Sequence, residues 1–147
     1  MSNLEIAMRF CESLECRDLA GSQTLLADDF VAKGPTMELT KQQVIAYLQL
    51  LFTAFPDHSF GFADYEDKGE VIHFTTHERG THQGVLDLKT FGVPISLPPT
   101  NKSFRLPAGR LTLRVVNSKI AYFGEEAGEG GGLAGILDQL GVRLPGR

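Results

Sequence analysis

The chain has 147 residues, with 14 Lys and Arg against 18 Asp and Glu, and a formal net charge of −4. This length fits one domain over residues 1–147, which can bury a core without needing a disulfide or a metal. The acidic balance argues against nucleic-acid binding, because such binding needs a concentrated positive patch.

The sequence also predicts the compartment. Glu5 and Arg9 interrupt the apolar residues at the N-terminus, which argues against a signal peptide, and no later run approaches membrane-spanning length. Cys11 and Cys16 lie five positions apart in a predicted helix, so their side chains diverge and cannot readily form a disulfide. We therefore expect a cytoplasmic protein without membrane contact, whose two cysteines are buried as small apolar groups.

The first third of the chain is predicted to be helical. Apolar residues recur at steps of three and four over 4–14, which is typical of a helix with one buried face. A shorter apolar group follows at 25–30. Thr40 and Gln43 have the spacing of a capping box, and the helical apolar stripe behind them ends at Pro56.

The apolar period then falls to about two, which predicts strands. The segments 60–65 and 71–82 form a hairpin whose turn lies at 66–69. The segment 84–103 contains Gly92 and three prolines, which are too many breakers for regular structure, so it is predicted to be a long loop.

A second hairpin and a short helix complete the predicted fold. Strands at 109–116 and 119–125 are joined by a tight turn at Asn117 and Ser118. The tail 127–147 combines a glycine-rich turn with a short apolar helix. Helices followed by antiparallel strands indicate an α+β domain, in which helices pack on one face of a curved, cone-shaped antiparallel sheet that can enclose a pocket.

No metal or cofactor site is predicted. His77, Glu78 and His82 resemble a zinc-protease motif, but the two histidines are five positions apart on a strand instead of four apart on a helix. His73 and His77 share a strand face, yet about 13 Å separates them at roughly 3.3 Å per residue. The glycine-rich tail matches neither a phosphate loop nor a dinucleotide fingerprint. With no nucleophile motif either, proton-transfer chemistry remains.

Strand alternation suggests which side chains face the pocket. If Ile72 and Phe74 face the interior, then Thr76, Glu78 and His82 lie on the same side. Polar groups would then enter an apolar interior.

The last hairpin adds a carboxylate to the same interior. Leu111 and Leu113 share one face of their strand, and Phe123 and Glu125 share one face of the next. A carboxyl group at the wall of a partly dry cavity has its acid form favoured, which suits a general acid or base. Glu125 is the main catalytic candidate, with Glu78 and His82 as further candidates. The predicted substrate-binding side chains are Phe74, Thr76, Leu111, Leu113 and Phe123.

Structural roles for these residues stay open. Glu125 lies near a strand end and can reach solvent instead of the cavity. Glu78 can form an ion pair with Arg79 or Arg114, or accept from a backbone amide. His82, between glycines, can stabilise a turn by hydrogen bonding.

Four short motifs carry a family resemblance. Phe55-Pro56-Asp57 closes a helix, and it is followed by 80–84 (Gly-Thr-His-Gln-Gly), 98–102 (Pro-Pro-Thr-Asn-Lys) and 135–141 (Gly-Ile-Leu-Asp-Gln-Leu-Gly). In this order and spacing, over residues 4–141, the chain resembles the SnoaL-like polyketide cyclase family of the nuclear transport factor 2-like superfamily. The resemblance implies a cone-shaped α+β fold and a homodimer.

The resemblance also implies an activity. Characterised members carry out a cofactor-free intramolecular aldol condensation on an aromatic polyketide ester, with a carboxylate near the end of the last strand as general acid/base. That carboxylate corresponds to Glu125, which replaces the family's Asp. A histidine that polarises the substrate carbonyl in those enzymes corresponds to Leu111.

Three hypotheses follow. The first is a cofactor-free cyclase or isomerase acting on a polyketide-like or other apolar carbonyl compound, with Glu125 as general acid/base and Glu78 or His82 as its polar partner. The second is a non-catalytic protein that binds a small apolar molecule in the same pocket, favoured by Leu111. The third is a structural module whose sheet face mediates association.

Overall fold

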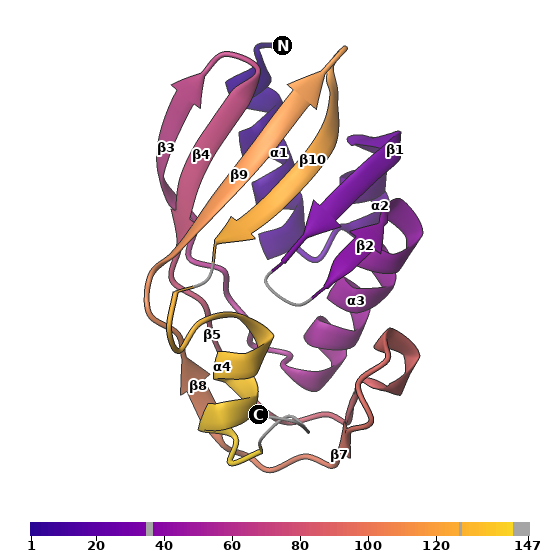
Figure 1. The fold of residues 1–147 in the computed structure, drawn as a ribbon, viewed down its shortest axis with the longest axis vertical. Helices are drawn as coiled ribbons and strands as arrows, with labels where there is room; N and C mark the ends of the chain where they lie inside the picture. Colours follow the sequence, from indigo (N-terminus) through magenta and orange to yellow (C-terminus); the bar gives the residue numbers. More distant parts are fainter. Residues whose placement is uncertain (35–36, 127, 143–147) are drawn as a thin grey trace.

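The computed structural model describes residues 1–34, 37–126 and 128–142 (Figure 1). In chain order its elements are α1 (Asn3–Glu15), α2 (Leu19–Thr24), β1 (Leu26–Lys33), β2 (Glu38–Thr40), α3 (Lys41–Ala54), β3 (Ala63–Lys68), β4 (Val71–Thr76), β5 (Arg79–Thr81), β6 (Leu86–Asp87), the 3-10 turn η1 (Lys89–Phe91), β7 (Ser96–Leu97), β8 (Ser103–Arg105), β9 (Gly109–Val116), β10 (Lys119–Glu126) and α4 (Gly132–Gln139).

Two capping boxes fix the starts of the long helices. Thr40 caps α3 by accepting from the Gln43 backbone N–H, as the sequence predicts. Ser2, which was not predicted as a cap, caps α1 by accepting from the Glu5 backbone N–H. The α3 helix ends at Ala54, two residues before Pro56, which cannot continue it.

The main sheet has the order β2-β1-β10-β9-β4-β3. Figure 1 shows α1 across the back of this sheet, where it packs on β4, β9 and β10. The predicted α+β class and curved sheet are confirmed, with one correction. The sheet is mixed and not purely antiparallel, because β1 runs parallel to β10. The α3 helix follows β1 and β2 and packs beside them, closing that side of the cone.

The prediction that the first third is helical is wrong for residues 26–33, which form strand β1. The inward side chains are Leu26, Phe30 and Ala32, while Asp28 and Asp29 are both exposed. A register irregularity between Leu26 and Val31 places two consecutive residues outward. The buried residues Leu26 and Phe30 are therefore four positions apart, which is the spacing of a helix and not the alternation of a regular strand.

The predicted extended run 71–82 is interrupted after β4. His77 pairs instead with the segment before β3, through its backbone N–H to the Phe60 carbonyl oxygen, 2.8 Å. The short β5 then pairs with β8, outside the main sheet. The hairpin of β3 and β4 is confirmed, and its turn lies at Gly69 and Glu70.

The segment 84–103 is more regular than predicted. It contains the β6–β7 pair with η1 between them, and its Leu86 and Leu88 are buried in the core. Leu88 and Ile95 are joined by a backbone hydrogen bond of 2.9 Å. The breakers therefore lie at the turns of short strands, with Gly92 in the left-handed region at φ 81°.

Of the remaining predictions, some are confirmed and one is wrong. The hairpin of β9 and β10 with its Asn117–Ser118 turn is confirmed, as is the C-terminal helix, α4. Residues 127 and 143–147 of the predicted tail lie outside the described residues. Cys11 is buried, but the prediction for Cys16 is wrong, because it sits exposed at the end of α1. None of the described helices is long and apolar enough to cross a membrane.

Candidate functional site

A cavity of about 120 Å³ lies inside the cone. Its walls come from α1, α3, β1, the ends of β4, β9 and β10, and the N-terminal half of α4. The side chains that reach it are mostly aliphatic or aromatic. They include Phe10, Leu14, Phe30, Leu48, Leu51, Phe60, Leu111, Phe123, Leu133 and Ile136, together with the polar residues Tyr47, Thr76, Glu78 and Glu125.

Strand pairing places Glu125 in the cavity wall. On β10, Phe123 lies opposite Leu113 of β9 and Glu125 lies opposite Leu111, so all four share the inner face. A register irregularity at Ala121 brings the buried Ile120 onto this same face.

The environment of Glu125 favours its protonated form. Burial among apolar side chains, with a smaller contribution from the negative charge of Glu78, raises the pKa of Glu125 from 4.5 to about 7. At neutral pH this carboxyl group is poised to take up or release a proton, which is the property a general acid/base needs.

Glu78 is held by a residue that the sequence does not single out. Its Oε2 atom lies 3.1 Å from Nε2 of His58, and its side chain is 16% exposed. The expected partners of the Glu78 side chain were Arg79, Arg114 or a backbone amide, and the contact with His58 corrects this. Arg114 instead pairs with Glu70 at 3.8 Å.

The His58 ring is buried in an aromatic cluster. Its centroid lies 4.4 Å from that of Phe60 and 5.9 Å from that of Phe52. Nδ1 of His58 has no hydrogen-bond partner among the described residues. An N–H at Nε2 of His58 can donate to Glu78, whereas an N–H at Nδ1 would find no acceptor among the described residues. His58 therefore orients Glu78 toward the cavity.

Tyr47 of α3 adds a neutral donor. Burial, with the charges of Glu78 and Glu125, raises the pKa of Tyr47 above its usual range, so the phenol keeps its proton. Its ring packs edge-on against Phe91 of η1, with centroids 5.5 Å apart. A bound ligand that carries an acceptor can use this donor.

The structure brings together five of the eight predicted site residues. Thr76, Glu78, Leu111, Phe123 and Glu125 line the cavity. Phe74 and Leu113 are fully buried, as their strand parity predicts, but they belong to the core behind the wall.

His82 lies apart from the carboxylates. The interruption of the strand at His77 and Glu78 takes His82 to the β5–β8 end, where its ring packs on Phe55. Its Nδ1 atom lies 2.9 Å from Thr100 Oγ1, and burial lowers its pKa. These contacts match the turn-stabilising role considered above.

Two residues of the site, His58 and Tyr47, are not among those predicted from the sequence. His58 is separated from Glu78 by 20 positions, and no spacing rule links a post-helix turn to a strand end. Tyr47 could have been found, because it lies on the same α3 face as the wall residues Val44, Leu48 and Leu51.

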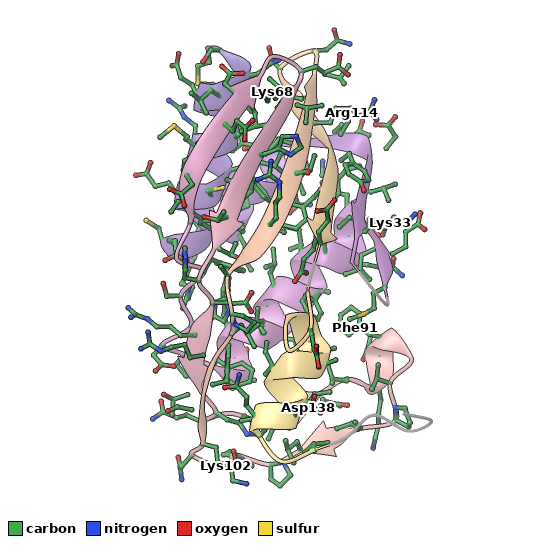
Figure 2. All side chains as sticks on the ribbon, turned by 60° about the vertical axis from the view of Figure 1, so that its left-hand side comes forward. Lys33, Lys68, Phe91, Lys102, Arg114 and Asp138 are labelled. Carbon is green, nitrogen blue, oxygen red and sulfur yellow. The ribbon has the colours of Figure 1, made fainter. Side chains whose placement is uncertain are left out.

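Within the part of the chain that the structure describes, no three His, Cys, Asp or Glu side chains converge in a group that could hold a metal ion. Lys33 is the one cationic residue in the described lining, and it is exposed. Figure 2 shows its side chain at the outer edge of β1.

The comparisons with known proteins agree with this architecture. A family model described as SnoaL-like polyketide cyclase matches residues 5–122, which is most of the chain. The chain belongs to this family. No curated protein matches it significantly.

Solved structures of SnoaL-like and related proteins share the fold at low identity. AclR of Streptomyces galilaeus, described as a candidate hydroxylase, has a TM-score of 0.73 at 18% identity, with 93% of each chain covered. IdmH of Streptomyces antibioticus, a candidate polyketide cyclase, has a TM-score of 0.69 at 20% identity, covering 94% of this chain and 97% of its own.

A further neighbour comes from Catenulispora acidiphila. It has a ketosteroid isomerase-like fold and was solved in complex with trimethylamine. Its TM-score is 0.67 at 14% identity, with 97% of this chain and 95% of that chain covered. At these identities the likeness establishes the fold, and the chemistry has to be argued from the cavity.

Proposed function

We propose that this SnoaL-like protein is a cofactor-free cyclase or isomerase that acts on an apolar carbonyl compound, with Glu125 as general acid/base. The observation that carries the proposal is the place of Glu125, whose carboxyl group lines an apolar cavity with a pKa of about 7. Membership of the polyketide cyclase family supports the same reaction class.

The chemistry needs one group that first takes and then returns a proton. In an aldol-type closure, the Glu125 carboxylate removes a proton from the carbon between two carbonyl groups, and an enolate forms. The enolate carbon attacks a second carbonyl carbon of the same molecule, so a carbon–carbon bond forms and the C=O π bond opens to an alkoxide. Glu125 then returns its proton to the alkoxide oxygen. The apolar walls hold both ends of the substrate together.

The polar neighbours of Glu125 support this cycle in different ways. Tyr47 can donate a hydrogen bond to the oxygen that becomes negative in the enolate. The charge of Glu78 disfavours the ionised form of Glu125, which strengthens Glu125 as a base once it has lost its proton. Of the two polar partners expected for Glu125, the cavity lining favours Glu78 over His82.

A second function rests on Leu111. This residue lies directly opposite Glu125 and is 4% exposed, so an apolar side chain fills the place of the family's polarising histidine. A protein that binds a small apolar molecule without converting it would have the same walls. In that case Glu125 would only orient the ligand.

Substitution of Glu125 separates the two functions. If the protein is an enzyme, Glu125→Gln should lower the turnover rate of a β-keto ester by at least about a hundredfold, as is usual for a lost general base, while ligand affinity changes little. The measurement is the steady-state rate together with calorimetric binding of the same compound. Loss of affinity with no detectable wild-type turnover would favour the binding protein instead.

Glu126 provides the matched control. It is the next residue on β10 and is exposed on the opposite face of the sheet. Glu126→Gln makes the same chemical change outside the cavity, so it should leave turnover and affinity at their wild-type values. An equal loss of turnover in both variants would contradict the role given to Glu125.

A further inference from the structure

The free volume of the cavity limits what can bind beside Glu125. The cavity measures about 120 Å³. An engineered apolar cavity of about 150 Å³ in another protein holds one benzene molecule, whereas pockets for drug-sized ligands run from about 300 to 1,000 Å³. The room inside this cavity is therefore that of about one ring, and Glu125 also borders a separate, more open hollow of about 290 Å³.

The walls on the α4 side are firmly packed. Leu133 and Ile136 of α4 line the cavity, and the neighbouring Leu137 is fully buried without lining it. Gly135 packs so closely that a Cβ atom there would overlap the Gly130 carbonyl oxygen. Because closely packed side chains are hard to displace, widening the cavity on this side would cost packing energy.

The charges of the lining limit the ligand in a second way. Glu78 and Glu125 both face the cavity, and the described lining offers no buried cation to balance an incoming anion. A carboxylate or phosphate would lose its hydration and meet two acidic groups. An uncharged carbonyl group, in contrast, can accept a hydrogen bond from Tyr47 or from protonated Glu125.

Together, size and charge define a substrate class. We propose that the site takes an uncharged carbonyl compound of about one ring, such as a monocyclic β-keto ester or ketone, and discriminates against polycyclic and anionic compounds. This inference rests on the proposed function for its carbonyl chemistry, but its size and charge limits are properties of the cavity alone.

A graded ligand panel tests these limits. Calorimetry at pH 6.5 would compare ethyl 2-oxocyclohexanecarboxylate with methyl 1-oxotetralin-2-carboxylate and with a four-ring anthraquinone-fused β-keto ester. Acetophenone and benzoate form the second pair, which matches size and differs in charge. Wild type should bind the one-ring ester at least about tenfold more tightly than the four-ring ester, and acetophenone at least about tenfold more tightly than benzoate.

Variants of α4 connect this selectivity to the wall. Leu133→Ala enlarges the cavity and should tighten binding of the two-ring ester by about threefold or more. Leu137→Ala removes the same atoms from the same helix without touching the lining, so it should leave the ratio of affinities unchanged. If Leu133→Ala does not fold, Ile136→Val makes a smaller enlargement of the same wall.

Each outcome decides the inference. Equal or tighter binding of the four-ring ester by wild type overturns it, as does tight binding of benzoate or no binding by any one-ring compound. Parallel turnover assays separate it from the proposed function. Selective binding of one-ring compounds, with no Glu125-dependent exchange of the proton between the two carbonyl groups of the one-ring ester, leaves the inference standing and ends the enzyme hypothesis. Glu125-dependent turnover of the four-ring ester does the reverse.

Discussion

The ionisation of Glu125 links the chemistry of the site to the stability of the fold. In the folded protein the pKa of Glu125 is about 7, above its ordinary value of 4.5, so the folded state binds this proton more tightly than the unfolded chain. The resulting stabilisation is complete below about pH 4.5, decreases as pH rises and is lost above about pH 7. The rise in pKa corresponds to a change on the order of 3 kcal/mol.

Glu125→Gln should remove this dependence, because the amide stays neutral. We expect urea unfolding of wild type between pH 5 and pH 8 to give a free energy that falls relative to the Glu125→Gln variant as pH rises, with the variant the more stable protein at pH 8. Glu126→Gln should keep the wild-type slope. Parallel curves for wild type and Glu125→Gln would place the titrating group elsewhere.

A site residue could be predicted when its role follows from residues close to it in the sequence. Glu125 could be predicted because alternation along one strand joins it to Phe123 and so to the apolar face. His58 could not, because it meets Glu78 only after the chain has folded back between α3 and β4. The cavity role predicted for His82 assumed one continuous strand from Val71 to His82. Because β4 ends at Thr76 and β5 begins at Arg79, the alternation of side chains does not extend to His82.

At the scale of elements, α4 depends on one close backbone approach. A Cβ atom at Gly135 would overlap the Gly130 carbonyl oxygen and press on Leu106. Gly135→Ala should therefore lower the free energy of unfolding by about 1–3 kcal/mol, as overpacking does, and weaken ligand binding by displacing the α4 wall. Thermal unfolding with and without ligand measures both effects.

Gly128 is the control on the same segment. A Cβ there would meet nothing within 4 Å, so Gly128→Ala should leave the midpoint and ligand affinity near wild type. Equal midpoints for both variants would mean that α4 can shift to accommodate the methyl group, which would weaken the case for a firm cavity wall.

Elements with uninterrupted periodicity were the predictable ones. The capping box and apolar stripe of α3, and the two-residue turn of the last hairpin, are local signals that nothing overrides. In β1 the register irregularity interrupts the period of two by which a strand is recognised in a sequence. Between β6 and β7, Leu86 pairs with Leu97 across a segment whose Gly and Pro residues individually predict a loop. Both errors come from pairing partners that are distant in sequence.

At the scale of the whole molecule, the fold is shared with proteins of low sequence identity. Identities of 18% and 20% accompany TM-scores of 0.73 and 0.69 over nearly the full chain. A pattern of buried and exposed positions is enough to specify the cone, because many apolar residues satisfy it. The chemistry depends instead on a few side chains, such as Leu111 and Glu125, which the pattern leaves free to vary.

The uncovered sheet face leads to the final prediction. Figure 1 shows α1 behind the sheet, while no described helix crosses the front of β3, β4 and β9. On this face Thr112 and Tyr122 border an open hollow of about 290 Å³. We expect a homodimer that associates through this face, so light scattering at micromolar concentration should give twice the chain mass of 16.1 kDa.

Charge placed on the face tests where the dimer forms. Thr112→Arg would put a third cation between Arg110 and Arg114 on β9, and their repulsion across a two-fold interface should shift the protein to monomer. Gln49→Arg adds the same charge on the exposed side of α3 and should leave the dimer intact. A monomeric wild type would contradict the dimer itself, whereas a dimer that survives Thr112→Arg would move the interface away from this face.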